Sequence, residues 1–183
     1  MSSTLRQFLD LLLRRAGPSD LPASPRLLAG TFAALLAVQG ALAAMLGESP
    51  AGMLPRATVS GALLLGWVWF LTRVYGHPAR FLQTATAFLG VTLLSAPVLI
   101  PLAVSALGAA TAPPDIKLSL PLLLLAAAGL YLLIVESRIL ADAIEQPVFL
   151  CVLLVLAGES LIGAIAFFIG LVPPPPGAAG SPA

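Results

Sequence analysis

Five long apolar runs account for most of this sequence, and they limit what the chain can fold into. They cover residues 27–46, 57–75, 82–107, 118–136 and 148–171. Each run has roughly the 20 residues that a helix needs to cross the hydrocarbon core of a bilayer. The apolar residues are consecutive and do not alternate with polar ones, which favours helices over the strands of a barrel. The sequence therefore predicts an all-α polytopic integral membrane protein, a five-helix transmembrane bundle over residues 27–171.

The composition excludes a soluble fold and several classes of partner. Hydrophobic residues make up 59% of the chain and charged residues 9%, whereas soluble domains carry roughly 25% charged residues. The net charge is +1 and the basic residues are scattered, so we expect that the protein does not bind nucleic acid. We expect the lipid bilayer as its main contact. The single cysteine, Cys151, belongs to no metal-binding or redox motif, so we expect neither a metal nor a cofactor.

Residues 1–26 precede the first run and predict a short cytoplasmic amphipathic helix followed by a linker. Leu5, Phe8 and Leu12 recur on one helical face, and the Gly-Pro pair at 17–18 stops the helix. This face predicts either a helix that lies on the cytoplasmic leaflet or a lid that packs over the cytoplasmic ends of the spans.

The first run has its own start signal, with Ser24 as N-cap and Pro25 at the first helical position. A cleavable signal peptide is the rival interpretation, because the small residues at 41–43 match a cleavage site. The long lead of mixed charge before the run argues against cleavage.

Basic residues predict the orientation in the membrane, because cytoplasmic loops carry an excess of Lys and Arg. With a cytoplasmic N-terminus, the inner set is Arg6, Arg14, Arg15, Arg26, Arg73, Arg80 and Arg138, and the outer set is Arg56 and Lys117. The C-terminus is then outside, with a disordered Pro- and Gly-rich tail at 172–183. Richness in Ala, Leu and Pro favours a bacterial source, and so a multi-pass protein of the cell inner (plasma) membrane.

Glu159 is a carboxylic acid near the middle of the last apolar run. An ionised acid at the bilayer centre costs roughly 2.5–3.5 kcal/mol, so this side chain should be protonated, paired or in contact with water. No Lys or Arg lies at matching depth in another run. Gln39, Thr92 and Ser95 are the partners available at that depth, and with Glu159 they form the candidate intramembrane polar site.

Two runs carry small residues at helical spacing, which would let a neighbouring helix approach closely. The candidate packing residues are Gly30, Ala34, Ala37 and Ala41 in the first run and Gly163, Ala166 and Gly170 beside Glu159 in the last. These faces predict association with other membrane proteins or with a second copy of the chain.

Pro97 and Pro101 lie one turn apart in the third run. Each removes a backbone hydrogen bond, so the sequence predicts a kink or break of the helix there. The hydroxyls of Thr92 and Ser95 would satisfy the freed carbonyls. Transporters build binding sites at broken helices, but such helices are also common in proteins that transport nothing, so this feature favours transport only slightly.

The stretch VESRILADAIEQP, residues 135–147, is polar but keeps helical periodicity. Its acidic residues are Glu136, Asp142 and Glu145. It predicts a continuation of the fourth helix into the cytoplasm, with either a solvated face or a surface for a protein partner.

The sequence contains no metalloprotease, serine-hydrolase or P-loop motif. An enzyme needs at least a nucleophile and a base. We expect the membrane interior to hold only one Glu, one Gln and some hydroxyls, so we expect that the protein is not an enzyme.

Residues 76–102, GHPARFLQTATAFLGVTLLSAPVLIPL, together with the five spans and the expected orientation, resemble the bacterial branch of the Yip family. The resemblance implies a small five-span membrane protein, whose eukaryotic relatives bind Rab-type GTPases and assist vesicle traffic. The long acidic cytoplasmic N-terminal region of those relatives is absent from this sequence, which argues against GTPase binding. The resemblance assigns a role to no residue.

These features predict an inner-membrane scaffold or accessory subunit without a catalytic site, acting through helix–helix association. The alternative is a small transporter or channel component that uses Glu159 as an intramembrane proton or cation site. The two hypotheses differ in the expected effect of Glu159→Gln, because a hydrogen-bonding contact tolerates an amide and a proton carrier does not.

Overall fold

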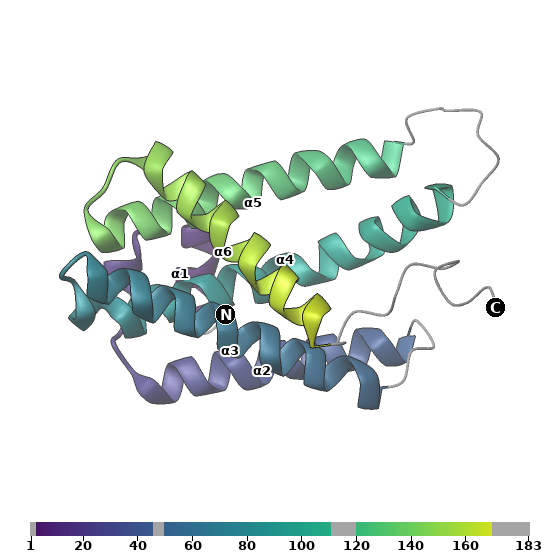
Figure 1. Cartoon of the computed structure of the whole chain (residues 1–183), viewed down its shortest axis with the longest axis horizontal. Helices are drawn as coiled ribbons and strands as arrows, with labels where there is room; N and C mark the ends of the chain where they lie inside the picture. The colour runs from purple at the N-terminus through teal and green to yellow at the C-terminus, as the bar shows by residue number, and fades with distance from the viewer. Residues whose placement is uncertain (1–2, 46–49, 111–119, 170–183) are drawn as a thin grey trace.

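The structure, a computed structural model, describes residues 3–45, 50–110 and 120–169. Every regular element in these ranges is a helix (Figure 1). In order they are α1 (Ser3–Leu12), the 3-10 turn η1 (Pro18–Asp20), α2 (Pro25–Met45), α3 (Pro50–Val74), the 3-10 turn η2 (Pro78–Arg80), α4 (Phe81–Ala110), α5 (Leu120–Ile144) and α6 (Val148–Phe168). Helices α2 to α6 are long and apolar enough to cross a membrane. The predicted all-α architecture with five spans is confirmed.

Helix α2 starts where the sequence predicts. The backbone N–H of Leu27 donates to the Ser24 hydroxyl (3.3 Å), and that of Leu28 donates to the Ser24 carbonyl (3.1 Å). Pro25 occupies the first helical position, where its missing N–H removes no helical hydrogen bond. The predicted N-cap is confirmed.

Helices α3 and α5 extend beyond the predicted runs. α3 begins at Pro50 and not near residue 57, and α5 ends at Ile144 and not near residue 136. A helix does not have to stop where an apolar run stops, because Glu and Arg are good helix formers. The predicted continuation of the fourth span as a helix is confirmed.

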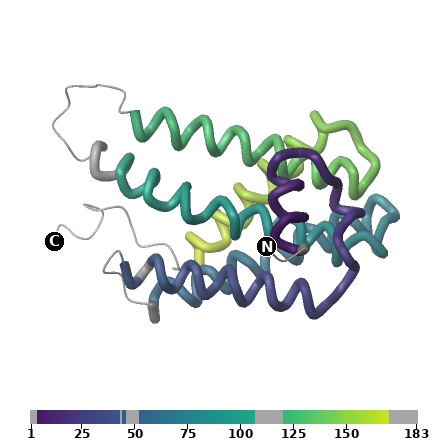
Figure 2. Tube along the Cα trace, turned by 180° about the vertical axis from the view of Figure 1, so that it is seen from behind, coloured from purple at the N-terminus to yellow at the C-terminus, as the bar shows by residue number. Residues whose placement is uncertain are grey.

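The short connections gather at one end of the bundle, at the left of Figure 1. These are the turn between α3 and α4 and the turn between α5 and α6. Helix α1 lies across the side of the bundle, in the half next to this end (Figure 2). From this end α6 crosses the face of the bundle diagonally. We call the end of the bundle that carries these two turns the connected end.

The buried core lies in the half of the bundle next to the connected end. It is built from the last turns of α3 and α5 and the first turns of α4 and α6. Its members include Val68, Leu71, Phe88, Val91, Val135, Leu140, Ile144, Cys151 and Val155. The far halves of α4 and α5 expose large apolar side chains such as Val98 and Leu122, as expected of surfaces that face lipid.

Helix α1 packs against the sides of α4 and α5. Phe8 and Leu11 are buried, and the Phe8 ring lies against Gly90 of α4, where a Cβ would overlap it. The Tyr131 hydroxyl of α5 donates to the Leu12 carbonyl (2.7 Å). The apolar face of α1 is therefore used inside the molecule, and it contacts the side of the bundle and not the ends of the spans.

Helix α4 is not broken at Pro97 and Pro101. It continues as one helix from Phe81 to Ala110, so a break is excluded, and the alternative of a kink stays a prediction. A proline removes one hydrogen bond from the ladder, and the remaining bonds of this long helix hold it together. Its packing against α2 and α5 supports it on both sides.

The hydroxyls of Thr92 and Ser95 do not repair the prolines. Thr92 donates to the Phe88 carbonyl (2.9 Å) and Ser95 donates to the Thr92 carbonyl (3.0 Å). The carbonyl that Pro97 leaves without its helical donor is that of Leu93, four residues earlier. The predicted repair is wrong, because a Ser or Thr side chain reaches only the carbonyls three or four residues before it.

Most of the predicted small packing residues face away from the bundle. Gly30, Ala34, Ala37, Ala41 and Gly163 are exposed, Ala166 is buried, and Gly170 lies outside the described residues. A Cβ on Gly30 or Gly163 would meet nothing within 4 Å. Helix α2 instead buries Thr31 and Leu35, because a larger side chain removes more apolar area from its surroundings.

Close helix contacts form at other glycines. Gly61 of α3 lies against the Phe32 ring of α2, and Gly158 of α6 lies against the Trp67 indole of α3. The Trp67 indole N–H also donates to the Leu154 carbonyl (3.2 Å). Each contact pairs one glycine with one aromatic ring on another helix, so no repeat within a single run reveals it.

Candidate functional site

A cavity of about 690 Å³ lies among helices α2 to α6. Leucines from all five helices make most of its lining. The same five helices contribute the polar residues Gln39, Ser60, Thr92, Ser95, Glu136 and Glu159. The cavity is therefore amphipathic, with polar groups inside an apolar wall.

The two carboxylates of the cavity lie at similar depths. At the helical rise of 1.5 Å per residue, Glu159 is about 17 Å from the start of α6 and Glu136 is about 12 Å from the end of α5. Both of these helix ends are at the connected end of the bundle (Figure 1). A hydrocarbon core is roughly 30 Å thick, so both side chains fall within the membrane-spanning part.

The structure brings together all four residues of the predicted polar site. Glu159, Gln39, Thr92 and Ser95 line this one cavity. The two hydroxyls donate within their own helix. Among the described residues, nothing forms a hydrogen bond or ion pair with the Glu159 carboxylate. The predicted partners surround Glu159 without engaging it, and its oxygens stay open to a ligand.

Glu136 belongs to the cavity, and the sequence analysis did not assign it there. It was grouped with the cytoplasmic acidic stretch because the apolar run ends beside it. The signal was nevertheless present, since Gly129, Leu132, Leu133 and Glu136 follow the i, i+3, i+4, i+7 pattern of one helical face and all line the cavity. Among the described residues Glu136 also has no hydrogen-bond partner.

The charge in the cavity is one-sided. Glu136 and Glu159 line the same cavity, so they would repel each other when both are ionised. None of the described residues that line the cavity is Lys, Arg or His. Like charges without a counter-charge are costly in a low dielectric. The arrangement therefore fits the binding of protons or of a cation.

A bound metal ion fits these residues less well. The described part of the chain contains no cluster of three or more His, Cys, Asp or Glu side chains. A Ca²⁺ ion takes about six to eight oxygen ligands, and Mg²⁺ demands a near-octahedral set. Two carboxylates fall short of such a cage.

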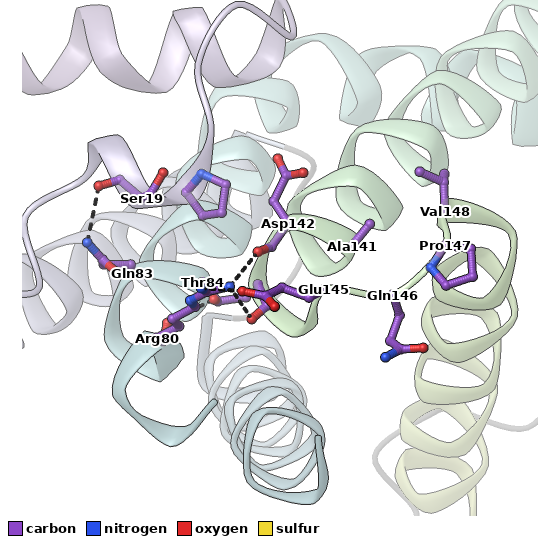
Figure 3. A pocket seen from close by; sticks show the side chains of 12 residues that line it. Ser19, Arg80, Gln83, Thr84, Ala141, Asp142, Glu145, Gln146, Pro147 and Val148 are labelled. Carbon is purple, nitrogen blue, oxygen red and sulfur yellow. Dashed lines mark hydrogen bonds and ion pairs between the residues drawn. The ribbon is translucent and has the colours of Figure 1, made fainter. Parts of the chain in front are cut away.

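A second cavity, of about 550 Å³, lies at the connected end (Figure 3). Its central side chain is Arg80, at the start of α4. One guanidinium nitrogen of Arg80 donates to the carbonyls of Asp142 (3.0 Å) and Ala143 (3.2 Å), and the other pairs with Glu145 (2.6 Å). These bonds cap the carbonyls that the end of α5 leaves without a donor.

Gln83 makes a similar connection on the other side of this cavity. Its amide nitrogen donates to the carbonyls of Ser19 (3.3 Å) and Leu21 (2.8 Å). Arg80 and Gln83 thus join α4 to α5 and to the linker before α2. Their donors are used inside the protein, so this cavity has a structural role.

Glu145 is the acidic member of the ion pair with Arg80. The hydrogen bond from Arg80 and the Arg80 charge lower the pKa of Glu145 below its ordinary value of 4.5. His77 adds a smaller effect, with its Nε2 atom 4.0 Å from the carboxylate.

Acid should therefore weaken the connected end. Because the folded pKa of Glu145 is lowered, its stabilising contribution is present above the unfolded pKa and is lost as the pH falls through the folded value. We expect the Tm of the protein in detergent to fall by a few degrees more than that of Glu145→Gln between about pH 6 and about pH 3. Asp142→Asn is the control, because Arg80 bonds to the backbone of Asp142 and not to its side chain. Parallel Tm curves for wild type and Glu145→Gln would contradict this role.

No family model matches the chain, and no curated protein or solved structure is detectably similar to it. The resemblance of residues 76–102 to the Yip family stays a prediction.

Proposed function

We propose that the protein is a small transporter or channel component that binds protons or a cation at Glu159 and Glu136. The observation that carries the proposal is the single cavity that holds both carboxylates, with no basic side chain among its described lining residues. Ionisable side chains within a membrane are costly, and they usually mark ion pathways or proton relays. The proposed role involves no covalent chemistry.

The position of the cavity supports this function. Many transporters bind substrate and coupling ion near the middle of the bilayer, between helices of the bundle. Here five helices contribute to the wall, so a small change in their packing would alter access to the carboxylates. The support comes from this cavity and not from a broken helix, since α4 is continuous.

The flux of protons tests the proposal. Purified protein in proteoliposomes with an imposed pH gradient should dissipate that gradient when Na⁺, K⁺ or an organic cation is added, as followed with a pH-sensitive dye inside the vesicles. Protein-free liposomes are the control. A gradient that stays unchanged with every cation, in vesicles that contain folded protein, would overturn the proposal.

We also propose that the connected end faces the cytoplasm of a bacterial cell, with the protein in the inner membrane. Arg26 at the start of α2, Arg73 near the end of α3 and Arg80 at the start of α4 all lie at this end, in agreement with the positive-inside rule. A reporter that is active only outside the cytoplasm should be active when fused to the C-terminus, and a reporter that is active only inside should be inactive. The reverse result would contradict the orientation.

A scaffold role is the second candidate, and one observation favours it. The small residues of α2 are exposed, and a Cβ on Gly30 would meet nothing within 4 Å. Such a face would let a helix of another protein approach closely. The scaffold role needs no ligand in the cavity, so the behaviour of Glu159 variants separates the two candidates.

A further inference from the structure

We propose that the cavity binds the primary ammonium group of a hydrophobic alkylamine. This inference rests on the proposed function, because it names the chemical class of cation that the Glu136 and Glu159 cavity takes. It follows from four properties of the cavity: its size, its wall, the arrangement of its acceptors and the absence of aromatic side chains from its described lining.

The size of the cavity excludes a bare inorganic ion as a good fit. Cavities of about 300–1,000 Å³ hold drug-sized organic molecules, and this one measures about 690 Å³. A dehydrated Na⁺ or K⁺ ion would leave most of this volume empty or filled with water. An organic cation fills the space and brings its own charge.

The wall of the cavity fits a hydrocarbon chain. Leu35, Leu64, Leu99, Leu130 and Leu156 come from five different helices and surround the polar residues. Apolar contact with these side chains removes alkyl surface from water, at a gain of about 25 cal/mol for each Å². A ligand with a short polar head and a longer apolar tail therefore matches both parts of the lining.

The acceptors of the cavity fit a primary ammonium group. An –NH₃⁺ group has three N–H donors and no acceptor. Glu136 and Glu159 offer carboxylate oxygens without a hydrogen-bond donor among the described residues, and the Gln39 side-chain carbonyl offers a neutral acceptor on the same wall. The ammonium charge also offsets the repulsion between the two carboxylates.

The wall does not fit a quaternary ammonium group. Proteins bind quaternary ammonium in cages of Trp, Tyr and Phe rings, through cation–π attraction. No aromatic side chain belongs to the described lining of this cavity. A quaternary nitrogen also has no N–H to donate, so the carboxylates would meet only its methyl groups.

Binding of three matched probes tests the inference. We would titrate the full chain in lipid nanodiscs with octylammonium, octyltrimethylammonium and 1-octanol by calorimetry, and subtract the heat measured with empty nanodiscs. The three probes share the alkyl tail and differ in the head. Octylammonium should bind saturably, and its affinity should exceed that of the quaternary probe by roughly tenfold or more, because charge-assisted hydrogen bonds are lost with the N–H groups. The alcohol should show no saturable binding.

Variants connect the binding to the two carboxylates. Glu136→Gln should weaken octylammonium binding by roughly tenfold or more while the helical circular dichroism and the Tm stay close to wild type. Glu145→Gln, far from the cavity at the connected end, should bind as wild type. Equal binding of octanol and octylammonium, or unchanged binding in Glu136→Gln, would overturn the inference.

The outcomes for binding and for transport are separable. Gradient dissipation by Na⁺ or K⁺ without octylammonium binding would overturn the amine inference and leave the transport proposal standing. Saturable octylammonium binding without any flux would support the amine site and contradict transport. Absence of both would reject the two proposals together.

Discussion

Glu159→Gln is expected to abolish most of the cation-dependent proton flux in proteoliposomes and to leave the bundle assembled. The amide has nearly the shape of the acid but carries neither a negative charge nor an exchangeable carboxyl proton. Because the amide can neither release a proton nor hold a cation by its charge, we expect the rate to fall by roughly tenfold or more, which corresponds to a barrier higher by about 1.4 kcal/mol or more. The measurement is the initial rate of gradient dissipation per reconstituted protein, at matched vesicle size.

The side chain of Glu159 has no partner among the described residues, so the substitution removes no internal hydrogen bond. Circular dichroism and gel filtration should therefore match wild type. Glu145→Gln is the matched control, because it makes the same chemical change at an exposed residue outside the cavity. Wild-type flux in Glu159→Gln would contradict the transport proposal. If that variant also keeps a native partner or a native oligomer, the scaffold role would be favoured.

Gly158→Ala is expected to destabilise the bundle and to loosen the contact between α3 and α6. The added Cβ would overlap the Trp67 indole, whose N–H donates to the Leu154 carbonyl (3.2 Å). Forcing one carbon into a packed contact costs about 1–3 kcal/mol. Displacing the indole also weakens its hydrogen bond, worth about 1 kcal/mol. The free energy of unfolding, measured by SDS titration in mixed micelles, should fall accordingly.

Gly163→Ala is the matched control for this prediction. Gly163 lies on the same helix, and a Cβ there would meet nothing within 4 Å. Because Ala favours a helix over Gly by about 1 kcal/mol in water, this variant should be as stable as wild type or slightly more stable. Equal stability of the two alanine variants would contradict the proposed contact between Gly158 and Trp67.

Much of the candidate site was predictable from the sequence. The cost of an acid within a membrane singles out Glu159 in the last run, and depth along each helix selects Gln39, Thr92 and Ser95. Depth is a property of one helix at a time, so it can be counted along the chain. The structure places these four residues on one cavity because the spans run side by side.

Depth along the helix was not sufficient to assign Glu136 to the cavity. Its run was ended at the first charged residue, although α5 continues to Ile144. Whether such a residue faces the bundle or its surroundings depends on the rotation of α5 about its axis. That rotation is set by neighbouring helices and not by α5 itself.

The prediction of packing faces from small residues was wrong at most positions for the same reason. Ala34 and Ala37 lie on one face of α2, as their spacing requires, but the residues that α2 buries, Thr31 and Leu35, lie on a neighbouring face. The contacts that bring helices close use Gly61 and Gly158, which are single glycines opposite aromatic rings. A pattern within one helix carries no information about the ring that a partner helix supplies.

The sequence by itself determined the all-α membrane class, the number of spans and the N-cap at Ser24, because these depend on local hydrophobicity and on backbone hydrogen bonding. Only the tertiary structure decided that α1 packs against α4 and α5, that α4 passes its prolines unbroken, and that Glu136 joins Glu159 in one cavity. These features depend on which helix faces meet. In an apolar environment many faces are nearly equal in hydrophobicity, so close packing and a few hydrogen bonds make that choice.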